Sequence, residues 1–281
     1  MNFKPVIYPE DSIILAPLSG FTDAPYRASA RRHGCYYLFT EMVDASSVVY
    51  GNYQSEKMLL RRPDEEWLGI QLVGGQKDRI EKAVDILNRH EFDLLDFNLG
   101  CPAPKIARKG AGAILGMQPD LAASIFERIV KLSRFPVTAK IRILDEHDPE
   151  PTLYLCRLLR DAGAQAITIH GRIKKAIYSG PVFAGIIAAV RDELDIQIIA
   201  NGGVMNYRSY QTLRNESKCS CVMLARGAMG NPWLFRRLQE PDNFVAPSLD
   251  EFLDEMNAHV SDMLDYFGEG LGCKVCRKVI L

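Results

Sequence analysis

The stretch FDLLDFNLGCPAPKIARKGAGAIL, residues 92–115, contains the two features on which the predicted fold depends. It begins as an apolar run, FDLLDFNL, of the kind that forms a strand buried on both faces. It then turns abruptly into a loop that holds Cys101, two prolines and three basic residues. A buried strand that ends in a loop with reactive side chains is the unit from which α/β enzymes are built.

Similar apolar runs recur along the chain, and helical patterns lie between them. The runs are 12–18, 37–42, 68–73, 92–99, 137–143, 166–171, 197–203 and 221–226, and the helical patterns include 77–90, 119–133 and 151–163. Eight strand–helix units predict an α/β fold, a (β/α)8 TIM barrel, over residues 1–240. A doubly wound sheet is the alternative, but no G-x-G-x-x-G motif follows the first strand and there is no P-loop.

Each predicted strand ends in a polar or otherwise distinctive residue. These residues are Pro17, Glu41, Gln71, Asn98, Lys140, His170, Asn201 and Arg226. In a barrel, the carboxyl ends of all strands lie at one face, where the active site forms. Any one of these residues is explained by an ordinary strand end, whereas eight in the same position predict a common site.

The sequence changes character after residue 240. PDNFVAPS, residues 241–248, is typical of a linker, and apolar residues then form a helical stripe from Leu249 to Phe267. Ser248 and Glu251 match a capping box at the start of that helix. We therefore expect a small C-terminal helical domain over 248–281, and we expect it to be incomplete because a further helical pattern is still in progress at its end.

Charge and composition exclude some classes of protein. The net charge is −1, so a polyanion would have to bind at a local basic patch. Residues 1–15 do not resemble a signal peptide, and no apolar run is long enough to span a membrane. The seven cysteines are scattered and no export signal is found, so we expect reduced thiols in the cytoplasm. We also expect a monomer.

Few residues have the spacing of a metal site. Cys273 and Cys276 have C-x2-C spacing without a second pair, and Cys219 and Cys221 lie within a strand pattern. We expect all four to be structural and predict no metal. His170 could be a base, a ligand or a hydrogen-bonded core residue.

Three groups at the predicted strand ends suggest chemistry. Gly202 and Gly203, with Arg226, favour a phosphate site at the last two strands, although turn glycines and a surface arginine are the alternative. Lys140 is a lysine inside an apolar strand, so it requires an anion or a lowered pKa. It could face the edge of a reduced flavin, form a Schiff base, or pair with Glu41 or Asp96.

Cys101 is the most distinctive of the candidate residues. Gly100 before it permits an unusual backbone conformation, and the proline after it fixes the exit of the loop. A thiol in this position could be a nucleophile or a proton donor, or it could be a buried structural cysteine. The basic residues that follow would favour a thiolate and attract phosphates. They are Lys105, Arg108 and Lys109.

Taken together, these segments resemble the tRNA-dihydrouridine synthase family, and its bacterial B-type branch most closely. The resemblance covers essentially the whole chain. The matching segments, in the order of the family, are APLSGFTDAPYR (16–27), TEM (40–42), GIQLVGG (69–75), DFNLGCPAPKIARKGAGAIL (96–115), VTAKIR (137–142), ITIHGR (167–172), ANGGV (200–204) and ARGAMGNPW (225–233).

The resemblance implies an enzyme that reduces the C5–C6 bond of a uridine in tRNA to dihydrouridine. It implies a barrel that holds FMN, NADPH as the reductant, and a C-terminal helical domain that binds tRNA. Hydride would pass from flavin N5 to C6, and Cys101 would give the proton to C5. The flavin would be held by Pro17, Leu18, Ser19, Gln71, Lys140, His170, Asn201, Gly202, Gly203, Ala225 and Arg226.

The strand ends and basic loops also suggest where tRNA would bind. Asn98 is a candidate to hold the edge of the base, and two basic loops are candidates for phosphate contacts. The candidates for tRNA contact are Asn98, Lys105, Arg108, Lys109, Arg142, Arg172, Lys174 and Lys175.

The chain departs from the family at one point that bears on the flavin. It has Ala225 before Arg226, where many relatives have glycine, although an alanine amide can still donate to a phosphate. A flavin barrel that acts on a free pyrimidine, such as a dihydroorotate dehydrogenase, is the nearest rival. A Schiff-base aldolase and a non-catalytic binding protein are the others.

Overall fold

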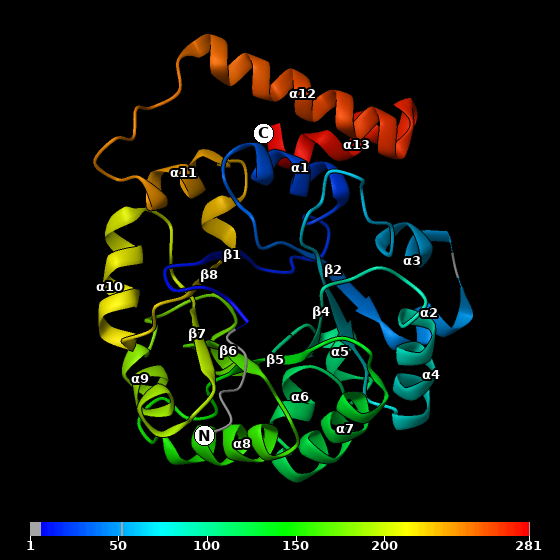
Figure 1. Ribbon diagram of the computed structural model, residues 1–281, viewed down its shortest axis with the longest axis vertical. Helices are drawn as coiled ribbons and strands as arrows, with labels where there is room; N and C mark the ends of the chain where they lie inside the picture. Colours follow the sequence, from blue (N-terminus) through cyan, green and yellow to red (C-terminus); the bar gives the residue numbers. More distant parts are fainter. Residues whose placement is uncertain (1–6, 52, 281) are drawn as a thin grey trace.

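The computed structural model describes residues 7–51 and 53–280, and its centre is a barrel of eight parallel strands. Figure 1 shows the strands around the centre and the helices around them. A parallel bridge between Ile14 and Tyr37 joins the first strand to the segment before the second. The strands are β1 (Ile13–Leu15), β2 (Phe39–Asp44), β3 (Gly69–Val73), β4 (Leu94–Leu99), β5 (Val137–Arg142), β6 (Ala166–His170), β7 (Gln197–Asn201) and β8 (Val222–Leu224).

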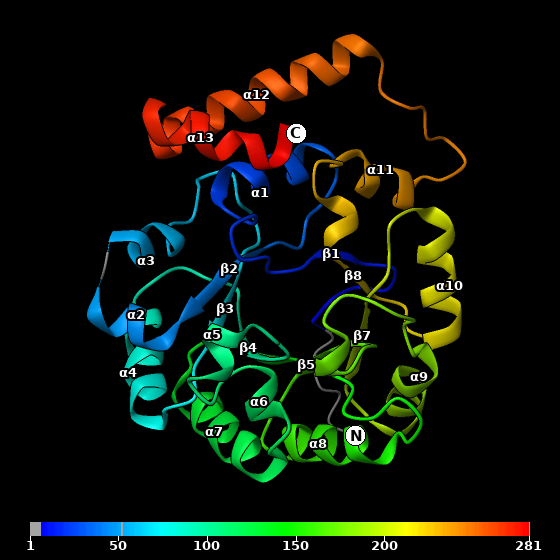
Figure 2. The same ribbon diagram turned by 180° about the vertical axis from the view of Figure 1, so that it is seen from behind.

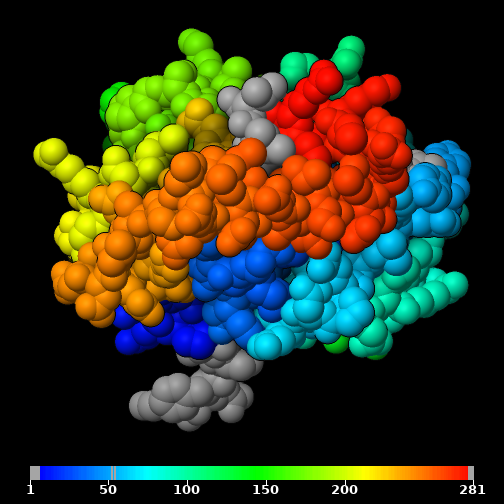
Figure 3. All heavy atoms as spheres, turned by 90° about the horizontal axis from the view of Figure 1, so that it is seen from above, coloured from blue at the N-terminus to red at the C-terminus, as the bar shows by residue number. Residues whose placement is uncertain are grey.

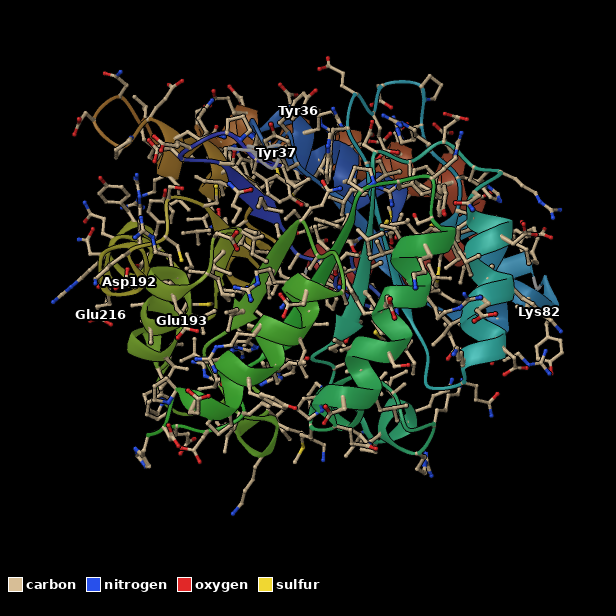
Figure 4. The ribbon with its side chains drawn as sticks, turned by 60° about the horizontal axis from the view of Figure 1, so that its bottom comes forward. Tyr36, Tyr37, Lys82, Asp192, Glu193 and Glu216 are labelled. Atoms are coloured by element: carbon tan, nitrogen blue, oxygen red, sulfur yellow. The ribbon has the colours of Figure 1, made fainter. Side chains whose placement is uncertain are left out.

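Helices follow the strands and form the outer layer, so the predicted (β/α)8 TIM barrel is confirmed. Figure 4 shows Lys82 on α4 and Glu193 on α9 in this outer layer. Several predicted runs extend past the observed strands, because the residues after each strand form the loops of the active face. The helices are α1 (Ala24–Arg32), α2 (Ala45–Tyr50), α3 (Tyr53–Met58), α4 (Lys77–Leu87), α5 (Pro104–Ala107), α6 (Ala113–Gly116), α7 (Pro119–Leu132), α8 (Glu150–Asp161), α9 (Ala184–Glu193), α10 (Tyr207–Ser217), α11 (Trp233–Gln239), α12 (Leu249–Phe267) and α13 (Glu269–Ile280), with 3-10 turns η1 (Lys174–Ala176) and η2 (Arg226–Ala228).

An apolar cluster fills one end of the barrel interior. Ile14, Phe39, Leu94 and Met223 come from four strands and pack together, separately from the larger core beneath the helices. Tyr8 lies in the same cluster, and its members fill the interior as layers of inward-facing side chains. This end of the barrel is a packed core, so a ligand has room only at the opposite end.

Aromatic rings cover the amino-terminal ends of the strands. The ring of Tyr37 packs edge-on against Tyr8 at 5.1 Å and against Trp67 at 5.3 Å between ring centroids. Figure 4 shows Tyr36 and Tyr37 close to β1. Edge-to-face packing of this kind adds to the stabilisation that burial provides.

The last two helices pack against the barrel through α1. Figures 1 and 2 show α12 and α13 beside α1 from opposite sides, and Figure 3 shows them lying across it. The predicted capping box at Ser248 and Glu251 is present at the start of α12. No helix in the described ranges is long and apolar enough to cross a membrane. The domain boundary between residues 240 and 248 stays a prediction.

Charged contacts anchor α12. The Arg32 guanidinium donates to both carboxylate oxygens of Glu255, each within 2.9 Å, and to Asp262 at 2.8 Å. His33 Nε2 lies 3.0 Å from Glu255 as well. Burial acts to raise the pKa of Glu255, but the hydrogen bonds from His33 and Arg32 outweigh it and lower the pKa from 4.5 to about 2. Because the pKa is lower in the folded protein, this stabilisation is present above about pH 4.5 and is lost as the pH falls toward 2.

We predict that Glu255→Gln loosens α12 from the barrel. Loss of the charged acceptor should destabilise this contact by about 1–3 kcal/mol, and amide hydrogen exchange in α12 should become faster. Asp254→Asn is the matched control, because it removes an exposed carboxylate from the neighbouring position. Equal exchange rates in the two variants would show that the Glu255 contacts do not anchor the helix.

Candidate active site

A cavity of about 330 Å³ lies at the carboxyl ends of the strands, at the end of the barrel opposite the apolar cluster. Seven of the eight distinctive strand-end residues line it. The exception is Glu41, which accepts a hydrogen bond from the backbone N–H of Gly20. All the residues predicted to hold a flavin line this cavity, namely Pro17, Leu18, Ser19, Gln71, Lys140, His170, Asn201, Gly202, Gly203, Ala225 and Arg226.

The described residues that line the cavity include four basic side chains and no carboxylate. The four are Lys140, Arg142, Arg172 and Arg226. Like charges close together in a partly buried site repel one another unless an anion lies among them. The cavity is therefore suited to a ligand that carries negative charge.

Lys140 is held in place by an oriented amide. Its Nζ donates to Asn201 Oδ1 at 2.8 Å, and Asn201 Nδ2 donates to the carbonyl of Met223 at 2.8 Å. Burial and, to a smaller extent, the charge of Arg142 lower the pKa of Lys140 to about 8, while the charge of Asp96 opposes the shift. The ammonium group is therefore still mostly protonated at pH 7 and projects among the cavity residues.

The surroundings of His170 favour its neutral form. Burial lowers its pKa to about 2, and the surrounding basic residues, Lys140 first among them, act in the same direction. Its Nε2 lies 3.3 Å from Nη1 of Arg172, an arrangement in which the imidazole accepts and the guanidinium donates. Of the three possibilities for His170, a hydrogen-bonding residue fits this environment best.

The loop that carries Cys101 is fixed by its backbone. Asn98 Oδ1 accepts from the N–H groups of Gly100 at 3.1 Å and Cys101 at 2.8 Å. The carbonyl of Gly100 accepts from Nε of Arg142 at 2.8 Å. The Cys101 side chain is partly exposed and lines the cavity, so it is accessible to a ligand there.

The glycine requirement near Cys101 is at a different residue from the one expected. Gly100, which would permit an unusual backbone conformation, does not have a positive φ. Gly112 has a φ of 60°, and a Cβ on it would lie 2.6 Å from the carbonyl oxygen of Cys101. The N–H of Ala113 donates to that same carbonyl at 2.9 Å. The chain thus turns back on the cysteine loop at a point where only glycine fits.

The residues predicted to contact tRNA fall into two groups. Arg142 and Arg172 are buried in the cavity wall, where they donate to the carbonyls of Gly100 and Gly180, respectively. Asn98 also lines the cavity. The remaining basic residues lie outside the cavity lining. Of these, Lys105, Arg108 and Lys175 are exposed, Lys174 is partly exposed, and Lys109 forms an ion pair with Asp44 at 2.7 Å.

Comparison with known proteins identifies the family. The model of the family described as dihydrouridine synthase (Dus) matches residues 14–281. The chain belongs to the dihydrouridine synthase family.

Individual relatives support the same assignment, and two of the three described here carry the B-type name that the sequence segments suggested. The chain is 33% identical over 273 residues to tRNA-dihydrouridine synthase B of Pasteurella multocida, covering 96% of this chain and 82% of that protein. It is 33% identical over 274 residues to the probable tRNA-dihydrouridine synthase of Rickettsia conorii, covering 96% and 83%. For tRNA-dihydrouridine synthase B of Pseudomonas aeruginosa the identity is 29% over 270 residues, covering 95% and 81%.

Sequence reasoning missed Tyr178, which also lines the cavity of this dihydrouridine synthase family member. Its ring lies 4.9 Å from the guanidinium carbon of Arg226 and 5.7 Å from that of Arg142. Its carbonyl accepts from Arg226 at 3.0 Å. Tyr178 lies in a loop without hydrophobic periodicity, so no pattern in the sequence could have placed it there.

We predict that Gly112→Ala disturbs the Cys101 loop. The methyl group would meet the carbonyl of Cys101, so the variant should lose about 1–3 kcal/mol more stability than Gly110→Ala. Gly110 is the matched control, because its φ is 64° and a Cβ there has no atom within 4 Å. Thermal unfolding of both variants measures the difference. Equal losses of stability in the two variants would mean that the loop accommodates the methyl group without a cost in free energy.

Proposed function

We propose that this protein reduces the C5–C6 bond of specific uridines in tRNA to dihydrouridine, with FMN as its cofactor and NADPH as the reductant. One observation carries the proposal: Cys101 and the basic strand-end residues line a single cavity in a member of the dihydrouridine synthase family. The names of the relatives supply the tRNA substrate.

The residues of the cavity fit a phosphorylated flavin. The volume of about 330 Å³ is in the range of cofactor sites. Backbone N–H groups of Gly202 and Gly203, with the charge of Arg226, suit the phosphate group. A Cβ on Gly202 would lie 2.8 Å from the His170 ring. Because glycine has no Cβ, the backbone can pass close to this ring at the cavity wall.

Lys140 is suited to the cofactor's ring system. A protonated ammonium can balance negative charge on the reduced flavin, which would supply hydride to C6 of the uracil. Asn201 directs the ammonium group, and Gln71 and His170 provide neutral hydrogen-bonding groups nearby. This role takes precedence over a Schiff base, because Lys140 lies among residues that together suit an anionic ring and its phosphate.

Cys101 is proposed as the general acid. After hydride is delivered to C6, the C5 carbon requires a proton, and a thiol is mostly protonated at neutral pH. Cys101 lines the cavity, and the hydrogen bonds from its loop to Asn98 and Arg142 limit its movement. The uridine must leave its base stack to reach this cavity.

Exposed basic residues beside the cavity are proposed to hold the tRNA backbone. Lys105 and Arg108 lie on and after α5, directly beyond the cysteine loop, and Lys175 lies after β6. Phosphate contacts of this type position a nucleic acid without reading its sequence. Helices α12 and α13 are proposed to add to this surface.

An absorbance experiment tests the function directly. The protein, loaded with FMN, should show flavin bands that NADPH bleaches without oxygen and that unmodified tRNA restores. Free uracil and orotate are the comparison substrates. Recovery with a free pyrimidine but not with tRNA would favour the rival barrel enzyme, and failure to bind flavin would overturn the proposal.

We predict that Cys101→Ala separates the two half-reactions. Flavin should stay bound and NADPH should still bleach it, while dihydrouridine formation falls by about 100-fold because the general acid is lost. Cys273→Ala is the control, since that cysteine is exposed on α13. Undiminished product in Cys101→Ala would remove the thiol from the mechanism.

A further inference from the structure

A chain of hydrogen bonds connects the buried residue Asp96 with the backbone at Cys101. Gln71 Nε2 donates to Asp96 Oδ2 at 2.7 Å, and Asn98 Nδ2 donates to Gln71 Oε1 at 2.7 Å. Asn98 Oδ1 in turn accepts from the N–H groups of Gly100 at 3.1 Å and Cys101 at 2.8 Å. We call Asp96, Gln71 and Asn98 the carboxylate–amide chain.

Only one orientation of the two amides satisfies this chain. An ionised carboxylate can only accept, so Gln71 must turn its NH2 group toward Asp96 and its oxygen toward Asn98. The backbone N–H groups at the other end can only donate, so Asn98 must turn its oxygen toward them. The two ends therefore specify the same orientation, although the oxygen and nitrogen of an amide have nearly the same shape.

The cost of burying Asp96 indicates that it has a purpose beyond packing. Asp96 is 1% exposed, and its second carboxylate oxygen, Oδ1, accepts a hydrogen bond from Thr138 Oγ1 at 2.7 Å. A buried carboxylate is expensive unless hydrogen bonds or charges compensate for it. Leu94, two residues earlier on the same strand and face, fills the interior without that cost.

We propose that Asp96 is a positioning residue that fixes the amide orientations of Gln71 and Asn98 and thereby holds the Cys101 loop. This inference rests on the proposed function only for the role of the thiol as general acid. It gives Asn98 a role in holding the loop, because both ends of its amide are engaged within the protein.

The ionisation of Asp96 should govern the chain. Burial raises the pKa of Asp96 to about 6, and the hydrogen bonds from Gln71 and Thr138 and the charge of Lys140 limit that rise. Besides Lys140, the titratable residue Tyr8 interacts electrostatically with this carboxylate. Burial raises the pKa of the Tyr8 phenol, so that group stays neutral. Below about pH 6 the protonated acid can donate to Gln71 as well as accept, so both amide orientations become possible.

The test uses Asp96→Asn in the protein of residues 1–281 with Cys273→Ala as background. The remaining cysteines that the structure describes, other than Cys101, are buried, so iodoacetamide reports on the Cys101 thiol. Asparagine keeps the shape of Asp96, but its amide can turn either its oxygen or its NH2 group toward Gln71. It therefore no longer specifies the orientation of the Gln71 amide. We expect the alkylation rate at pH 8 to change by at least about threefold.

The two half-reactions of the same variant should respond differently to the substitution. Flavin content and bleaching by NADPH should stay within about twofold of the parent, while dihydrouridine formation falls about tenfold because the acid is misplaced. The parent should also lose product formation below about pH 6, and Asp96→Asn should lack this inflection. A residue with only a structural role would not move a pH profile.

Thr138→Val is the matched control. It removes the hydrogen bond to the other oxygen of the same carboxylate and leaves the contact to Gln71. It is compared at pH 8, because loss of a hydrogen bond to the charged form raises the pKa of Asp96 further. We expect its alkylation and product rates to stay near those of the parent.

The outcomes separate this proposal from the proposed function. Parent-like alkylation and product rates in Asp96→Asn would overturn the positioning role. If that variant does not fold, a parent alkylation profile that follows the ionisation of the thiol alone, with no second inflection at lower pH, would do the same. A parent protein that never reduces tRNA would overturn the proposed function, and an altered alkylation rate in Asp96→Asn would then still support the carboxylate–amide chain.

Discussion

The site depends on one geometric constraint, the alternation of side chains along a strand. On β4, Leu94, Asp96 and Asn98 point into the barrel, and Leu95, Phe97 and Leu99 pack beneath the helices. The same period gives the interior a gradient, from apolar side chains at one end of the strands to polar ones at the other. Because the strands are parallel, all polar ends meet at one face, and the gradient itself creates both the core and the cavity.

Much of this was predictable from the sequence. The apolar runs gave the strands, and the distinctive residue at the end of each run gave the cavity wall, because strand length and side-chain period are local properties. Glu41 was the exception, since it contacts the N–H of Gly20 instead of the cavity. The capping box at Ser248 was also local and was predicted correctly.

The partners of these residues were not predictable, because they depend on which side chains the register places side by side. Arg142 and Arg172 were predicted to contact tRNA, which stays a prediction, and the structure shows in addition that both lie in the cavity wall and donate to backbone carbonyls. Asn98 was predicted to contact the base, which stays a prediction, and its amide was not expected to join Gln71 to the cysteine loop. A single sequence shows that an arginine is charged. It does not show which backbone carbonyl will accept a hydrogen bond from that arginine.

The polar layer also links the two ends of the proposed chemistry. Gln71 lines the cavity with the residues suited to the flavin, and it is the middle member of the carboxylate–amide chain that reaches Cys101. A ligand that contacts Gln71 therefore acts on the same amide that Asp96 orients. Asp96 in addition opposes the fall in the pKa of Lys140, so one buried negative charge favours the protonated lysine and also sets the direction of the amides. Such a charge is worth its desolvation cost because an apolar residue could supply neither effect.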